Sequence, residues 1–154
     1  MKKELTQQEV LQKATAYCSK SEHCECEVRQ KLFQWGYSQQ EIQNNIIDYL
    51  YDNNYMNTER YCNAFVSDKL RFQHWGRIKI RSMLQAKKLP RQDIENALKK
   101  IDEDMYADIL AQTANQKIRL SHLSLDDDKS RNQLYGFLLQ RGFESDLILR
   151  TFMF

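Results

Sequence analysis

The chain has 154 residues, 42% of them hydrophobic, and a formal net charge of +2. Its mean hydropathy of −0.74 is low for a compact globule and predicts an elongated shape with much surface. No apolar run approaches the roughly 18 residues of a membrane span, and no apolar stretch follows the first lysines as in a secretory signal. We therefore expect a cytoplasmic protein without a membrane segment.

Composition predicts an all-α fold, because only four Gly and one Pro interrupt a chain that is rich in helix-forming residues. A first helix is expected over residues 5–19 and a second from about Cys24 to a stop at Gly36. Ser38 is the expected N-cap of a third helix, with Glu41 completing a capping box.

The middle of the chain predicts two amphipathic helices with basic outer faces. After Asn57, the helical period places four aromatic residues on one apolar face: Tyr61, Phe65, Phe72 and Trp75. Gly76 is expected to take a left-handed cap position. Beyond it, Ile80, Met83 and Leu84 form a second apolar stripe, and Arg77, Arg81 and Lys88 line up beside that stripe.

Positive charge is concentrated in this middle segment. From residue 60 to residue 91 there are nine Lys and Arg against one acid, Asp68, which gives about +8. A solvated helix face is the simplest explanation, but such a face is usually diluted with Glu, as it is elsewhere in this chain. The segregation favours an anionic partner, and the candidate binding residues are Arg60, Lys69, Arg71, Arg77, Lys79, Arg81, Lys87 and Lys88.

An internal repeat organises the chain. Residues 28–46, 80–98 and 134–152 share one apolar pattern at offsets of 52 and 54 residues. Each repeat follows another helical stretch, which predicts helix triplets at about 5–53, 57–101 and 103–154. We expect one array, without linkers, that spans residues 1–154 as an elongated monomer.

Several residues resemble the signature of the RecX family, bacterial regulators of the RecA recombinase. These are Tyr55, Met56, Asn57, Arg60, Tyr61, Phe65, Val66, Lys69, Gly76, Ile80, Leu84 and Lys87, together with residues 27–32 upstream. The resemblance covers about residues 14–100, and the C-terminal unit fits by architecture more than by motif. The chain departs from the family pattern at Cys24, Thr58, Lys69 and Lys88, where Ser, Asp, Arg and Gly are usual.

The resemblance implies three tandem three-helix repeats and a role without catalysis. Family members bind in the groove of the RecA filament on DNA and usually oppose its extension, strand exchange and ATP hydrolysis. The implied role is therefore regulation of DNA repair, recombination and the SOS response. The sign of the effect, inhibition or activation, is not readable from the residues.

Catalytic and cofactor motifs are absent from the sequence. It has no Gly-rich phosphate loop, no G-x-S-x-G and no HExxH, so neither an enzyme nor a cofactor is expected. Cys18, His23, Cys24 and Cys26 are the one candidate metal set, but Cys24 and Cys26 should point to different helix faces, so free thiols are expected. Trp35 and Trp75 are expected to be core anchors.

Two alternatives to a filament regulator stay open. Lys and Arg near Tyr and Phe are also typical of a module that binds single-stranded DNA directly, without RecA. A helical adaptor with no nucleic-acid partner is the third class, and it predicts indifference to both RecA and DNA.

Overall fold

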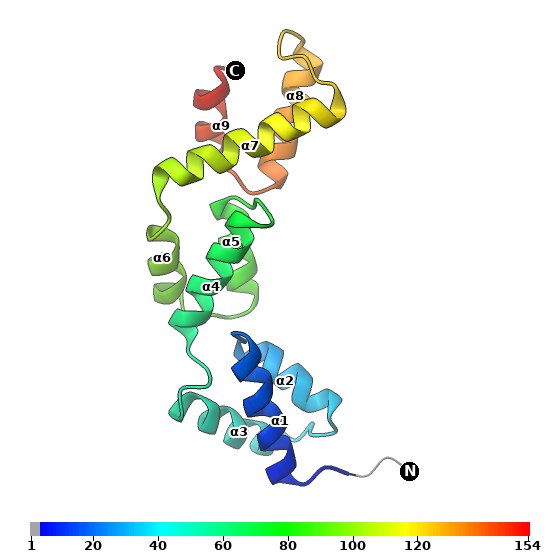
Figure 1. Ribbon diagram of the computed structural model, residues 1–154, viewed down its shortest axis with the longest axis vertical. Helices are drawn as coiled ribbons and strands as arrows, with labels where there is room; N and C mark the ends of the chain where they lie inside the picture. Colours follow the sequence, from blue (N-terminus) through cyan, green and yellow to red (C-terminus); the bar gives the residue numbers. More distant parts are fainter. Residues whose placement is uncertain (1–3) are drawn as a thin grey trace.

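The computed structural model describes residues 4–154, which form nine α-helices and no strand. Figure 1 shows three helix triplets stacked along one long axis, with the two termini at opposite ends. The first domain contains α1 (Gln7–Lys20), α2 (Glu25–Gln34) and α3 (Gln40–Asp52); the second α4 (Thr58–Arg71), α5 (Arg77–Ala86) and α6 (Arg91–Lys99); the third α7 (Glu103–Ser121), α8 (Asp128–Gln140) and α9 (Ser145–Phe152). The predicted all-α array of three tandem three-helix repeats is confirmed.

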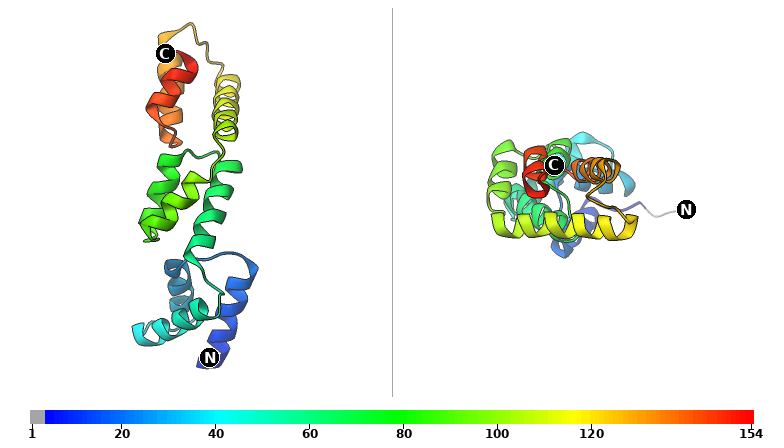
Figure 2. Two further views of the ribbon diagram at one scale, coloured as in Figure 1. Left: turned by 90° about the vertical axis from the view of Figure 1, so that its left-hand side faces the viewer. Right: turned by 90° about the horizontal axis from the view of Figure 1, so that it is seen from above.

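The first two domains have similar orientations, and the third is turned. In Figure 1, α3 and α6 lie on the left of α1 and α4, and α2 and α5 lie on the right, whereas α7 lies obliquely across the long axis. In the side view of Figure 2, α1, α4 and α7 follow one edge of the molecule. The first helices of the three domains therefore lie on one side of the array.

The repeat has a physical basis in one turn that recurs after the second helix of each domain. The backbone N–H of the residue after the turn donates to a carbonyl five residues earlier, in the pairs Tyr37 to Leu32 (2.8 Å), Leu89 to Leu84 (3.3 Å) and Phe143 to Leu138 (3.1 Å). The residue before each donor is left-handed: Gly36 (φ 96°), Lys88 (φ 61°) and Gly142 (φ 96°). This is the Schellman closure of a helix, which returns the chain sharply toward the third helix.

Polar side chains cap the N-termini of only some helices. Thr6 and Glu9 form a reciprocal capping box at α1, and Asn57 caps α4 through the N–H of Arg60. The Ser38 prediction is wrong, because α3 begins at Gln40 and its N-cap residue Gln39 makes no side-chain cap bond.

Two separate cores hold the array together. One belongs to the first domain alone and is built around Val10, Ala14, Val28, Leu32 and Leu50. The other runs without a break through the second and third domains, where the leucines that precede the two turns, Leu84 and Leu138, are fully buried. The second and third domains therefore share one apolar core, which Cys24 at the start of α2 also joins.

The predicted helix through Trp75 is too long. The helix α4 ends at Arg71, and a loop of five residues leads to α5, so Phe72 leaves the apolar face and is 76% exposed. Trp75 still packs beside Phe65, with ring centroids 6.5 Å apart. Gly76 is extended (φ −78°) and not left-handed, and His74 takes the positive φ instead.

Gly76 is required as a glycine by a close backbone contact and not by a left-handed conformation. Its N–H donates to the carbonyl of Arg141 (2.8 Å), and the N–H of Ile78 donates to the carbonyl of Gly142 (3.0 Å). A Cβ on Gly76 would lie 2.3 Å from the carbonyl carbon and oxygen of Gly142. The seam between the second and third domains is thus a direct contact of two backbones.

Candidate partner-binding surface

The eight predicted cations divide into two groups when their partners are compared. Four are engaged inside the chain: Arg60, Arg77, Arg81 and Lys87. The other four are Lys69, Arg71, Lys79 and Lys88. The first group is therefore paired within the chain, whereas the sequence predicts one unpaired outward-facing set.

Arg77 ties the second domain to the third. Its guanidinium lies 3.8 Å from the centroid of the Tyr106 ring and pairs with Glu103 (2.6 Å) and Glu144 (3.2 Å). Only 18% of the side chain is exposed. The hydroxyl of Tyr106 also donates to Glu144 (2.7 Å), so one partly buried network spans the seam.

Arg81 is also satisfied within its own domain. Two of its nitrogens approach the two carboxylate oxygens of Glu95 at 2.8 and 3.3 Å. This hydrogen bonding holds the pKa of Glu95 below its ordinary value. Arg81 therefore braces α5 against α6, and Lys88 lies beyond the end of α5, so it does not continue a helical stripe with Arg77 and Arg81.

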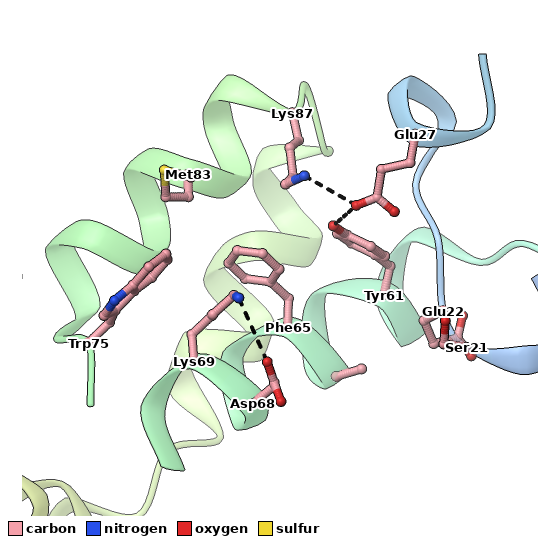
Figure 3. Close-up of a pocket in the computed structure, with 11 residues that line it drawn as sticks. Ser21, Glu22, Glu27, Tyr61, Phe65, Asp68, Lys69, Trp75, Met83 and Lys87 are labelled. Carbon is pink, nitrogen blue, oxygen red and sulfur yellow. Dashed lines mark hydrogen bonds and ion pairs between the residues drawn. The ribbon is translucent and has the colours of Figure 1, made fainter. Parts of the chain in front are cut away.

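The junction between the first and second domains depends on Glu27 of α2. Its carboxylate accepts hydrogen bonds from Tyr61 (2.7 Å), Lys87 (3.1 Å) and His23 (2.8 Å), as Figure 3 shows for the first two. Burial opposes the charge of this carboxylate, but hydrogen bonds from those three side chains outweigh it and lower the pKa of Glu27. Arg60 adds a second link, to Glu22 and to the carbonyl of Asn54 (3.1 Å).

Replacing Glu27 with Gln should weaken this junction in a pH-dependent way. Because the folded pKa is lowered, the carboxylate stabilises the fold above its ordinary pKa of 4.5 and loses that contribution as the pH falls through and below 4.5. We expect the free energy of unfolding to drop by about 1–2 kcal/mol at neutral pH, and the difference to shrink as the pH falls below 4.5. Urea unfolding over a series of pH values from neutral to acidic measures it. Glu41→Gln, on the exposed side of α3, is the control, and a pH-independent difference would contradict the assignment.

Around Trp75, two of the remaining cations gather beside a cavity. The Nζ atoms of Lys69 and Lys79 lie 5.1 and 4.3 Å from the centroid of the Trp75 ring, and that of Lys69 lies 5.4 Å from the Phe65 ring. The cavity, about 570 Å³, is lined by Phe65, Trp75 and Met83 and closed at one end by Glu27 (Figure 3). Trp75 is thus half-buried, with Phe65 beside it and the ammonium groups of two lysines over its ring.

The four remaining cations have few acidic partners within the chain. Lys69 has Asp68 at 3.8 Å, a distance at which an exposed pair contributes little. Within residues 4–154, no carboxylate pairs with Arg71, Lys79 or Lys88. We call these four residues together the middle basic surface, and three of them lie beside different cavities: Lys69 beside that of Trp75, Lys88 beside one that Glu25 and Arg29 also line, and Arg71 beside one that Ala97 and Met105 also line.

Lys88 is held at a conformational cost. It occupies the left-handed position that Gly36 and Gly142 fill in the other two domains, and its side chain is exposed beside a cavity of about 660 Å³. A residue with a Cβ is disfavoured there by about 1 kcal/mol or more.

We therefore expect Lys88→Gly to raise the free energy of unfolding by about 1 kcal/mol, while partner binding weakens through the lost charge. Thermal and urea unfolding measure the first effect. Lys88→Ala is the control, since it removes the charge but keeps the strain, and it should give no gain. A Gly variant no more stable than the Ala variant would show that φ at this position is not strained.

The cysteine cluster differs from the expectation. The sulfur atoms of Cys24 and Cys26 lie 3.1 Å apart, so they do not point to different faces. All four cysteines are free, and burial raises the pKa of Cys24 to about 12. In the described part of the chain, no three His, Cys, Asp or Glu side chains are placed to hold a metal ion.

One structural test concerns membranes. None of the helices in residues 4–154 combines the length and apolar character that crossing a bilayer requires.

Comparison with known families accounts for nearly the whole chain. It matches the first, second and third three-helix domains of RecX over residues 11–55, 57–98 and 103–152. The regulatory protein RecX of Clostridium botulinum (strain Eklund 17B / Type B) is 36% identical over 80% of this chain, which spans only 58% of that relative's length. The regulatory protein RecX of Actinobacillus pleuropneumoniae serotype 5b (strain L20) is 31% identical over 83% of this chain and 80% of its own.

A solved structure agrees with the fold. The crystal structure of RecX from Lactobacillus salivarius superposes with a TM-score of 0.77 at 22% identity, covering 96% of this chain and 94% of the other. On the strength of the three matched domains and these relatives, the chain belongs to the RecX family of regulatory proteins.

Proposed function

We propose that this protein is a non-catalytic regulator that binds the filament formed by RecA on DNA and inhibits its ATP hydrolysis and strand exchange. It acts as a monomer in the bacterial cytoplasm, in the control of DNA repair and recombination. The observation that carries the proposal is the succession of three RecX domains over residues 11–152.

The middle basic surface supplies the contact in this proposal. Lys69, Arg71, Lys79 and Lys88 carry positive charge without strong internal pairs, so they remain available for phosphate and for acidic protein surface. The elongated array provides a long, narrow body that suits a filament groove (Figure 1). Arg60, Arg77, Arg81 and Lys87 are excluded from this contact set, because they brace the array itself.

The test is RecA's DNA-dependent ATP hydrolysis, measured while purified protein is added. A concentration-dependent fall in the rate supports the proposal, and raising the salt concentration should restore the rate. An unchanged rate at every protein concentration would remove RecA filaments from consideration.

A further inference from the structure

Two cysteines lie in direct contact at the start of α2. Cys24 is the residue before the helix, Cys26 stands in its first turn, and their sulfur atoms lie 3.1 Å apart. A disulfide bond needs a separation of about 2.05 Å, so the two sulfurs are within about 1 Å of bonding distance. A small movement of two side chains would therefore bring them together.

The two sulfurs differ in their exposure to solvent. Cys26 is exposed, whereas Cys24 is only 3% exposed and joins the core of the second and third domains. Burial, and then the hydrogen bond with Cys26, raise the pKa of the Cys24 thiol to about 12. Cys24 therefore keeps its proton at neutral pH and can donate it to the sulfur of Cys26. A small oxidant in solution meets Cys26 first.

The exposed sulfur has cations beside it. Cys26 lines the cavity of about 660 Å³ described above, whose charged side chains are Glu25, Arg29, Lys87 and Lys88. Burial opposes the charge of Lys87, but the Glu27 carboxylate, followed by the two sulfurs when they are ionised, outweighs burial and raises the pKa of Lys87. The same attraction stabilises a thiolate beside the ammonium group, and the N-terminus of a helix acts in the same direction.

The remaining two cysteines lack both features. Cys18 and Cys62 are buried, with 6% and 0% of their surface exposed. Burial raises the pKa of each thiol to about 11, and neither thiol hydrogen-bonds to another cysteine in residues 4–154. They therefore serve as internal controls for the reactivity of the pair.

We infer that Cys26 and Cys24 form a modification site, a dithiol that hydroperoxides oxidise reversibly to a disulfide bond. The Cys26 thiolate attacks one oxygen of hydrogen peroxide, the O–O bond breaks, and sulfur gives up two electrons to become a sulfenic acid. The other peroxide oxygen takes up a proton and leaves as water.

Cys24 resolves this intermediate. Its sulfur attacks the sulfenic sulfur, so the S–S bond forms while the S–O bond breaks, and the departing hydroxide leaves with the Cys24 proton as a second water. Two thiols and one hydrogen peroxide thus give one disulfide and two molecules of water. A dithiol reductant supplies the two electrons and two protons that restore the pair.

The site lies where the first domain meets the second. Glu27 follows Cys26 directly, and its carboxylate accepts hydrogen bonds from the N–H of Cys24 (3.4 Å), from Tyr61 and from Lys87. The inference goes beyond the proposed function, because oxidation is measured on the full chain without RecA or DNA. It can therefore fail while the proposed regulation of RecA stands.

The test treats the purified full chain with hydrogen peroxide and follows each cysteine by mass spectrometry of its peptides. We expect the thiols of Cys24 and Cys26 to be lost together, at least about tenfold faster than those of Cys18 and Cys62. The peptide that holds the pair should lose two hydrogen atoms, and dithiothreitol should restore it. A disulfide between two copies of the chain, or equal rates for all four thiols, would overturn the inference.

Single variants separate the two roles, with Cys18→Ala as the control that should oxidise like the parent. Cys26→Ser should stop the rapid loss of thiols, since the exposed sulfur is gone. Cys24→Ala should leave Cys26 as a sulfenic acid that dimedone traps, and circular dichroism checks that this variant is folded. Trapping on the parent protein at early times gives a second measurement that needs no variant. Dimedone on Cys24 in place of Cys26, or rapid oxidation of Cys26→Ser, would contradict the assignment.

Discussion

Gly76→Ala is expected to destabilise the protein by about 3 kcal/mol. The added Cβ would lie 2.3 Å from the carbonyl group of Gly142 and 2.4 Å from the nitrogen of Phe143. These are main-chain atoms, and the Gly142 carbonyl also accepts the hydrogen bond from Ile78, so relief requires the two domains to separate. Urea unfolding followed by circular dichroism measures the loss.

Gly136→Ala is the matched control. Gly136 lies within α8, and a Cβ there would meet no atom within 4 Å. Because glycine is disfavoured inside a helix, this variant should gain up to about 1 kcal/mol. If both variants changed stability by the same amount and sign, the close approach of the two backbones at the seam would be disproved.

Reversing Lys69 and Lys79 to Glu is expected to weaken binding to the RecA filament by about 3 kcal/mol, roughly a hundredfold. Attraction to phosphate is lost at two sites, and repulsion replaces it. The fold should survive, because both side chains are partly exposed and give up their contacts with the Trp75 and Phe65 rings and the 3.8 Å approach of Lys69 to Asp68. The expected readout is a hundredfold higher protein concentration for half-inhibition of RecA's ATP hydrolysis.

Lys20→Glu with Lys129→Glu controls for the change in net charge. Both lysines are exposed and lie in the first and third domains, outside the middle basic surface. Similar inhibition by the two double variants would mean that the middle basic surface is not the contact. Arg77→Glu is unsuitable for this comparison, since breaking its pairs with Glu103 and Glu144 would unfold the seam.

The architecture could be predicted from the sequence because the repeat depends on local sequence patterns. A leucine and an aromatic or aliphatic residue at fixed spacing mark each turn, with a glycine between them in two of the three, and the apolar period specifies each buried face. Residue 88 shows the strength of this pattern, since the turn forms there although Lys replaces Gly.

The candidate surface could be predicted only in part, because the acidic partner of a cation can lie far from it in the sequence. Glu144 is 67 residues from Arg77 and Glu27 is 60 from Lys87, and no local period reports such pairs. The helical period also continued through Phe72 and Trp75, past the true end of α4, because aromatic residues in a loop can imitate a helical stripe.

The most direct test of the account titrates the protein onto single-stranded DNA twice, once coated with RecA and once bare, at the same salt concentration. Only the filament offers phosphates together with a protein groove, so we predict clearly tighter binding to the filament, with weaker but measurable binding to bare DNA. Equal affinity in the two titrations would contradict the account and identify the chain as a DNA-binding module that does not recognise RecA.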